Sequence, residues 1–179
     1  MLSPTLLRTL FTGLRQTFDF SSIEEITLEA NPATFTSRTA QFYQDLGVTR
    51  VSLGVQSFLG KHLETLGREH SPMQAITSVH LLREASDLEV NIDLIFSIPS
   101  QSLLDWEDTL TQALALQPEH LSAYNLTYEE DTAFFQKFQS GDYKDDPGLN
   151  AEMFSLSQEI LTTAGYEHYE TSNYSLPGR

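Results

Sequence analysis

Cysteine is absent from this sequence of 179 residues. Its absence excludes disulfides, thiol nucleophiles, thiolate metal sites and iron–sulfur clusters held by the chain itself. Basic residues are also scarce, because 10 lysines and arginines stand against 25 aspartates and glutamates, for a formal net charge of -15. This balance disfavours sequence-independent binding to nucleic acid or to an anionic membrane surface, since both need clustered positive charge. We interpret it as a solvated acidic surface.

Long apolar runs are missing as well. No run approaches the roughly 20 residues that span a bilayer. The N-terminus lacks the basic region, apolar core and small-residue cleavage site of a secretory signal. We therefore expect a cytoplasmic protein without a transmembrane segment. A hydrophobic content of 40% is enough for one globular domain of ordinary size.

Four segments have the apolar pattern of buried β-strands. They alternate with stretches in which apolar residues recur at helical spacing. Their approximate ranges are 23–30, 50–58, 90–99 and 121–128. Strands that alternate with helices pair in parallel through right-handed crossovers, so the sequence predicts an α/β fold.

Start signals indicate where three of the predicted helices begin. Ser3 and Ser71 are each followed by proline, which is typical of the first residues of a helix. Ser102 and Asp105 have the spacing of a capping box, with aspartate where glutamate or glutamine is usual.

Polar residues stand at or near the carboxyl ends of the predicted strands. In a parallel sheet these ends meet at one edge, where α/β folds bind their ligands. Asp93 lies among isoleucines and leucine, so its burial would carry a desolvation cost without an evident partner. The pattern predicts one shared site. Its candidate residues are Glu29, Asn31, Gln56, Asp93 and Thr127.

Six motifs follow one another along the chain: Leu28-Glu-Ala-Asn-Pro32, the segment 46–58, Leu66-Gly-Arg-Glu-His70, the segment 91–99, the segment 118–127 and the segment 164–174. Together they resemble the radical S-adenosylmethionine proteins related to oxygen-independent coproporphyrinogen III oxidase. The last two motifs favour the haem chaperone branch of that family. The resemblance implies a partial (β/α)6 radical SAM barrel, of which this chain covers about strands 3 to 6 with their helices.

The resemblance implies a cofactor-binding role for five residues. Glu29 is expected to contact the amino-acid part of S-adenosylmethionine, whose ammonium group suits a carboxylate. Gln56 and Asp93 match the family's ligand-contacting glutamine and aspartate. Arg68 could grip the ligand carboxylate with its planar guanidinium. Thr127 corresponds to a contact made mainly through position and backbone.

Each role has a structural alternative. Glu29 could instead pair with Arg50 or Arg68, and Gln56 could belong to an ordinary buried amide network. Arg68 could be a surface arginine on a loop. Ser97 stands where relatives commonly carry glycine, so the resemblance also implies an altered backbone approach there.

Histidines and phenylalanines offer further candidates, which we interpret as structural. The five histidines show no metal-ligand spacing and are expected in surface or capping roles. Three phenylalanines are expected to pack in the core or a lid and not to form a porphyrin platform. These residues are His62, His70, His80, His120 and His168, and Phe134, Phe135 and Phe138.

Two motifs of the family are missing, the three-cysteine motif that holds its [4Fe–4S] cluster and a Gly-Gly-Gly-Thr-Pro motif. We therefore expect residues 1–179 to be a single incomplete radical SAM core domain, without the N-terminal cluster-binding part and without the C-terminal domain. Reductive cleavage of S-adenosylmethionine takes an electron from the cluster, so the chain alone is expected to be inactive. An incomplete barrel would leave an unpaired strand edge and a poorly stable or self-associating fragment.

Three hypotheses for function follow. The favoured one is a haem chaperone that binds S-adenosylmethionine, a [4Fe–4S] cluster and haem. The second is oxidative decarboxylation of coproporphyrinogen III. The third, independent of the resemblance, is an acid–base barrel enzyme that uses Glu29 and Asp93 as a carboxylate pair. The expected partners are these small molecules and a protein that receives haem, a homodimer being left open.

Overall fold

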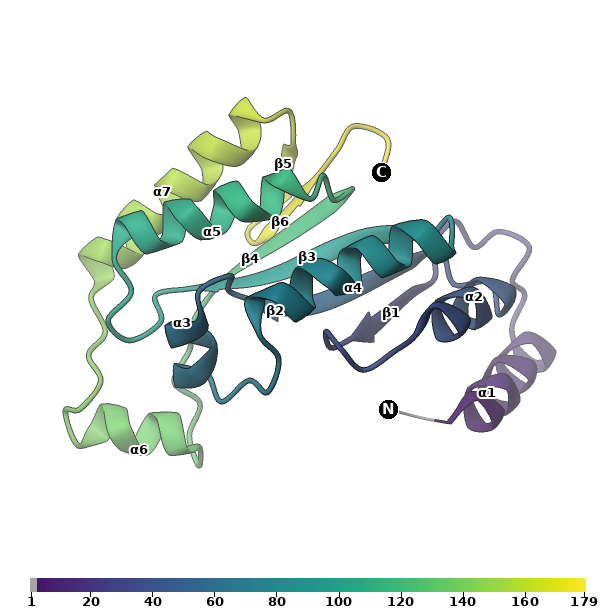
Figure 1. Cartoon of the computed structure of the whole chain (residues 1–179), viewed down its shortest axis with the longest axis horizontal. Coiled ribbons are helices and arrows are strands. Elements are labelled where there is room, and N and C mark those ends of the chain that lie inside the picture. Colours follow the sequence, from purple (N-terminus) through teal and green to yellow (C-terminus); the bar gives the residue numbers. More distant parts are fainter. Residues whose placement is uncertain (1–2) are drawn as a thin grey trace.

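The computed structural model describes residues 3–179. Figure 1 shows how the chain alternates between helices and the strands of one sheet. The helices are α1 Pro4–Thr17, α2 Ser37–Asp45, α3 Gly60–Thr65, α4 Pro72–Ala85, α5 Leu103–Ala115, α6 Ala133–Gln139 and α7 Pro147–Thr163, and the strands are β1 Thr27–Ala30, β2 Arg50–Gln56, β3 Glu89–Phe96, β4 His120–Asn125, β5 Glu167–Glu170 and β6 Asn173–Ser175.

All six strands belong to one sheet with the order β1-β2-β3-β4-β6-β5. The first four pair in parallel, which confirms the predicted α/β fold. The hairpin of β5 and β6 extends the sheet with antiparallel pairing and was not predicted. Its strands have only four and three residues, too few for the period-two pattern to stand out.

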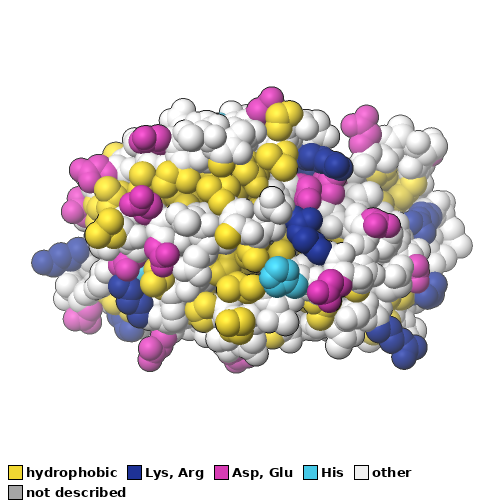
Figure 2. All heavy atoms as spheres, turned by 45° about the horizontal axis from the view of Figure 1, so that its top comes forward, with side chains coloured by type: hydrophobic (Ala, Val, Ile, Leu, Met, Phe, Trp, Pro, Cys, Tyr) yellow, Lys and Arg dark blue, Asp and Glu magenta, His cyan; other side chains and the backbone are white. Residues whose placement is uncertain are grey.

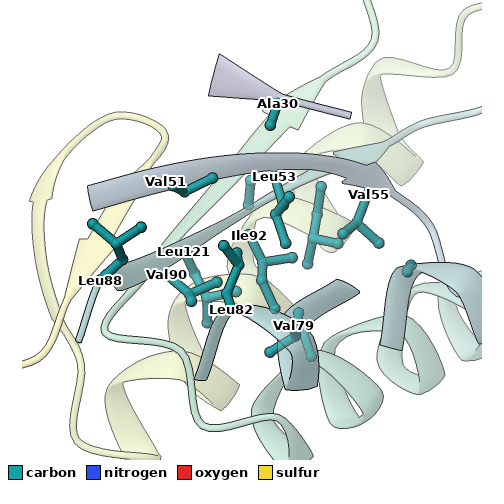
Figure 3. Close-up of a cluster of buried hydrophobic side chains, with 14 of the residues drawn as sticks. Ala30, Val51, Leu53, Val55, Val79, Leu82, Leu88, Val90, Ile92 and Leu121 are labelled. Carbon is teal, nitrogen blue, oxygen red and sulfur yellow. The ribbon is translucent and has the colours of Figure 1, made fainter. Parts of the chain in front are cut away.

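One face of the sheet carries the hydrophobic core. Alternate residues of β2 and β3 point to this face, where helices cover them. Figure 3 shows side chains of these strands meeting Val79 and Leu82 of α4. The most deeply buried of them are without solvent exposure, namely Val51, Leu53, Val55, Val90, Ile92 and Leu94.

The predicted capping signals act as expected. The Ser3 hydroxyl accepts a hydrogen bond from the amide of Leu6, and Pro4 begins α1. Ser102 and Asp105 form a reciprocal capping box, in which the shorter aspartate reaches the Ser102 amide at 3.0 Å. These local interactions fix where α1 and α5 begin, and hence where the preceding connections end.

The aromatic residues of α6 do not join the core. This helix has no buried residue, and in Figure 1 it lies away from the sheet at the end of a long excursion of the chain. Its rings contact each other and their flanks, as where Phe138 stacks on Tyr128 with a centroid separation of 4.7 Å. Of the two packing roles expected for these phenylalanines, the one in the core was therefore wrong, and the one in a lid stays a prediction.

The surface has no concentrated basic patch on the face shown in Figure 2. Acidic side chains are scattered there around an elongated hydrophobic band, and basic ones stand apart from each other. Within residues 3–179, no helix is long and apolar enough to cross a membrane. The described part of β1 pairs only with β2 and so forms the predicted edge of the sheet.

Candidate functional site

A cleft at the carboxyl ends of β1, β2 and β3 brings four of the five predicted residues together. Its volume is about 310 Å³. The parallel register places these strand ends side by side, as expected from the sequence. The lining residues are Glu29, Ala30, Asn31, Ser52, Gly54, Gln56, Arg68 and Asp93.

Gln56 ends β2 in an unusual backbone conformation. Its φ of 68° lies in the left-handed region, and the register with β3 shifts between Leu53 and Gln56. Such an irregularity re-aims a side chain at the end of a strand. A non-glycine residue with positive φ carries a strain that the surrounding structure must hold, and such residues gather at ligand sites. Sequence reasoning found Gln56 but not this conformation.

The Gln56 amide has no hydrogen-bond partner among residues 3–179, although the residue is only 8% exposed. The described residues therefore do not form the buried amide network that was the structural alternative for Gln56. A primary amide offers two donors and one acceptor. Gln56 thus presents unused hydrogen-bonding capacity to the cleft that it lines.

Gly54 allows the backbone of β2 to lie close to two cleft residues. A Cβ atom at this position would lie 3.0 Å from Gln56 Nε2 and 3.2 Å from Asn31 Oδ1. Any larger residue would push these amide groups aside. Gly54 was missed by sequence reasoning, although a glycine inside a strand pattern is itself a signal of close approach.

Glu29 and Arg68 line the cleft as exposed side chains. Within residues 3–179, no salt bridge joins Glu29 to Arg50 or to Arg68. Arg50 instead lies 2.5 Å from Glu25 and 3.7 Å from Glu89, measured from Nη2 to the carboxylate oxygens. The carboxylate of Glu29 and the guanidinium of Arg68 both remain available to a ligand that carries charges of both signs.

Asp93 is not without partners, and the sequence-based expectation on this point was wrong. Ser52 donates to Asp93 Oδ2 at 2.7 Å, and Asn91 Nδ2 donates to Oδ1 at 2.7 Å. Both donors lie on the polar face of the sheet, because Ser52 pairs in register with Asn91 on the neighbouring strand. Alternation on two strands thus supplies the partners that a reading of β3 alone could not show.

The pKa of Asp93 lies above its ordinary value. Burial is the main cause, and the negative charge of Glu29 adds to it. Hydrogen bonds from Ser52, Ser122 and Asn91 act in the opposite direction, because they stabilise the carboxylate. Asp93 is therefore a partly desolvated carboxyl group that its neighbours help to keep ionised.

A second hollow of about 430 Å³ adjoins the first. It lies between the loop that follows β1 and the loop that joins α3 to α4, and both hollows share Asn31 and Arg68. The two hollows are therefore neighbours that have these two side chains in common. Asn31 was noted as a strand-end residue from the sequence, and the structure places it between them.

Thr127 is the one predicted residue that the structure does not bring into the cleft. It follows β4 as an exposed residue, and its hydroxyl donates to Glu129 Oε1 at 3.1 Å. Its role stays a prediction from the resemblance.

Three histidines expected at the surface or at caps are buried, which corrects that expectation. His62, His70 and His120 are 2%, 8% and 4% exposed. His70 Nε2 lies 3.1 Å from the carbonyl oxygen of Val55, which ties the loop after α3 to the end of β2. Among residues 3–179, no three His, Asp or Glu side chains are grouped so that they could hold a metal ion.

The polar groups of the cleft fit S-adenosylmethionine. Its ammonium group needs a carboxylate, its carboxylate needs a guanidinium or amide donor, and its ribose hydroxyls need acceptors. Glu29, Arg68, Gln56 and Asp93 offer these groups around one space. An iron–sulfur cluster does not fit, since the chain has no cysteine to bind one.

Comparison with known proteins identifies the family. The family model of the radical SAM superfamily matches residues 3–113. The chain belongs to the radical SAM superfamily. This removes the hypothesis of a barrel enzyme unrelated to the family that the motifs resemble.

Several HemW proteins are similar to nearly the whole chain. The haem chaperone HemW of Escherichia coli K12 is 39% identical over 178 residues, in a match that covers 99% of this chain and 46% of the relative. HemW of Lactococcus lactis is 34% identical over 179 residues, covering 99% and 47%. The chain therefore spans about half the length of these relatives. The chain is HemW-like in sequence.

Solved structures confirm the radical SAM barrel fold. Coproporphyrinogen III oxidase HemN from Escherichia coli superposes with a TM-score of 0.86 at 24% identity, covering 99% of this chain and 41% of that one. An archaeal Elp3 from Methanocaldococcus infernus gives a TM-score of 0.69 at 24% identity, covering 76% of this chain and 33% of that one. At these identities the likeness concerns the fold alone.

Proposed function

We propose that this chain forms one wall of the S-adenosylmethionine site of a HemW-like haem chaperone. The observation that carries the proposal is the cleft in which Glu29, Gln56, Arg68 and Asp93 converge. The HemW-like sequence supplies the link to haem.

Each side chain has a role that its chemistry supports. Glu29 would bind the ammonium group and Arg68 the carboxylate of the amino-acid part, which would place two opposite charges on complementary partners. Gln56 and Asp93 would bind ribose hydroxyls, since the free Gln56 amide donates and accepts while the Asp93 carboxylate accepts. Thr127 would complete the site through the backbone after β4.

The complete protein would draw its [4Fe–4S] cluster from cysteines outside these 179 residues, since the chain contains none. In the complete protein such a cluster supplies the electron for the cleavage of S-adenosylmethionine. We place the protein in the cytoplasm, with haem as its cargo and a haem-requiring protein as the recipient. Residues 1–179 would be part of its radical SAM core domain.

The proposal is tested by equilibrium binding of S-adenosylmethionine and of haem to the complete protein, reconstituted without oxygen. We expect both to bind, and we expect Arg68→Ala to weaken S-adenosylmethionine binding by about tenfold or more, because it removes a charged hydrogen-bond donor. Arg38→Ala on α2 is the matched control, since Arg38 does not line this cleft. Wild-type affinity in Arg68→Ala, or equal losses in both variants, would contradict the site assignment.

The decarboxylase alternative is separated by a direct assay of the same protein. A haem chaperone would bind haem and leave coproporphyrinogen III unchanged. Release of carbon dioxide from coproporphyrinogen III would instead identify an oxidase, and our proposal of a chaperone would be abandoned.

A further inference from the structure

A chain of hydrogen-bonded side chains connects the hairpin of β5 and β6 to Asp93. The Tyr169 hydroxyl lies 2.7 Å from His120 Nε2, and His120 Nδ1 lies 2.6 Å from Asn91 Oδ1. Asn91 Nδ2 then donates to Asp93 Oδ1 at 2.7 Å. Asn91 is 5% exposed, His120 is 4% exposed and Tyr169 is 60% exposed. This series of hydrogen bonds therefore runs from the protein surface to the cleft.

The parallel register explains why these groups meet. Asn91 pairs with Ser52 on one side and with His120 on the other, and all three side chains lie on the polar face of the sheet. Asn91 Nδ2 lies 2.6 Å from Ser52 Oγ and 3.1 Å from Ser122 Oγ. Asn91 is thus the centre of a network that spans three adjacent strands.

The charge on Asp93 fixes which group donates and which accepts in every hydrogen bond from Tyr169 to Asp93. A carboxylate needs a donor, so Asn91 must turn Nδ2 toward Asp93 and its carbonyl oxygen toward His120. That oxygen needs a donor in turn, so Nδ1 of His120 carries the proton. Burial, followed by the positive charge of Arg50, lowers the pKa of His120 to about 4. The ring is neutral near pH 7, so its Nε2 accepts from the Tyr169 hydroxyl.

We propose that Asn91 is the positioning residue of Asp93, and that His120 and Tyr169 hold Asn91 in the orientation that donates to this carboxylate. Ser52, Asn91 and Ser122 each hydrogen-bond the Asp93 carboxylate, so Asp93 keeps about one of its roughly four acceptor positions for a ribose hydroxyl. Asn91 itself stays beneath the cleft, since it does not line it.

This inference rests on the proposed S-adenosylmethionine site, and its test separates the two. The variant is Asn91→Asp, which keeps the side-chain volume but replaces the donor with a second carboxylate. The other ionisable groups near Asp93 are Glu29 and Arg68 of the cleft and His120 of β4, and Asn91→Asp substitutes none of them.

We expect two carboxyl groups at this distance to share one proton, which raises the pKa of the pair. In the complete protein, the wild type should lose S-adenosylmethionine affinity as the pH falls through the pKa of Asp93. In Asn91→Asp the loss should begin about one pH unit or more higher, with about tenfold weaker binding near neutral pH because a charged hydrogen bond is lost.

Asn150→Asp on α7 is the matched control. Asn150 also donates to a carboxylate, with Nδ2 at 2.6 Å from Asp145 Oδ1, but outside the residues that line the cleft. Its pH profile should equal that of the wild type. An unchanged profile in Asn91→Asp, or the same shift in both variants, would overturn the role of Asn91.

A direct carboxyl titration distinguishes failure of this inference from failure of the proposed function. Carbon-13 NMR of labelled aspartate reports the pKa of Asp93 without any ligand. If the wild type binds no S-adenosylmethionine, the proposed function fails, while a higher Asp93 pKa in Asn91→Asp still supports the positioning role. An unchanged Asp93 pKa rejects it.

Tyr169→Phe tests the outer end of the chain with a substitution at an exposed residue, so it does not depend on Asn91→Asp folding. We expect the nitrogen-15 signal of His120 Nε2 to move as its donor is lost, with Nδ1 still protonated, and S-adenosylmethionine binding to weaken by about two- to threefold as a neutral hydrogen bond is lost. Tyr143→Phe, whose hydroxyl bonds Lys137 instead, is its control. A His120 signal that does not respond to Tyr169→Phe would rule out the hydrogen-bonded connection from Tyr169 to Asp93.

Discussion

The two faces of the same four parallel strands carry different kinds of side chain, apolar on one face and polar on the other. On the helix-covered face, residues such as Leu53 and Ile92 are fully buried in the hydrophobic core. On the other face, Ser52, Asn91 and Asp93 are joined by hydrogen bonds, and Ser52 and Asp93 line the cleft. One face therefore supplies the apolar burial on which folding depends, while the other carries the polar groups of the proposed ligand site.

The largest effect should come from breaking the apolar face. We expect Leu53→Ala to lower the free energy of unfolding by about 2 to 5 kcal/mol, because it removes a fully buried side chain and leaves a cavity. Urea unfolding of the complete protein, followed by circular dichroism, measures this. Ser52→Ala, the neighbour on the polar face, should cost less, about 1.5 kcal/mol, as its hydrogen bonds with Asp93 and Asn91 are lost. Equal losses would contradict the contrast between the faces.

Asp93→Asn should have the next largest effect, and it should fall on binding. Hydrogen bonds to a charged group contribute about 1.5 to 3 kcal/mol, so we expect S-adenosylmethionine affinity to fall by about ten- to a hundredfold. Calorimetric titration of the complete protein gives the value. Asp108→Asn, on the exposed side of α5, is a control that should leave the affinity unchanged.

The same substitution should change how stability depends on pH. Burial raises the pKa of Asp93 in the folded state, so the folded protein holds this proton more tightly than the unfolded chain does. Stability from this group is therefore lost as the pH rises from the ordinary value of 3.8 through the raised pKa. Relative to the wild type, Asp93→Asn should gain stability over that rise, as denaturant unfolding at both ends of the range would show. A constant difference would contradict the raised pKa.

Gly54→Ala should have a smaller effect on the same cleft. The added Cβ would meet the ends of the Gln56 and Asn31 side chains at 3.0 and 3.2 Å, and these flexible groups can move. We expect affinity for S-adenosylmethionine to fall by about three- to tenfold as Gln56 is displaced, with a stability change below about 1 kcal/mol. Gly60→Ala, which has no atom within 4 Å of its added Cβ, is the control. Unchanged binding in Gly54→Ala would show that Gln56 has no contact to lose.

The smallest expected effect is a gain in stability at Ser97. This residue has a φ of 63°, in the left-handed region that glycine adopts most readily. Ser97→Gly should relieve the strain of the left-handed conformation and raise the free energy of unfolding by about 0.5 to 1 kcal/mol. Thermal unfolding measures the gain. Ser86→Gly, at an extended φ of -158°, should destabilise instead, and a gain there would show that the effect does not come from backbone strain.

Much of the cleft was predictable because its residues end strands whose apolar patterns are strong. Glu29, Gln56 and Asp93 could be placed at one edge once the strands were known to be parallel, and Arg68 came from the resemblance. The hairpin of β5 and β6 could not be predicted in the same way, since three- and four-residue strands carry too little periodicity. His120 was misassigned because spacing along the chain does not show that its side chain meets Asn91 of the neighbouring strand.

The sequence by itself determined the α/β alternation, the helix starts and the set of polar strand ends, because hydrophobic periodicity and capping are local properties. Only the tertiary structure decided the partners of Asp93, the backbone of Gln56 and the path from Tyr169 to the cleft. These depend on register between strands far apart in sequence, where a shift of one residue would turn every side chain to the other face.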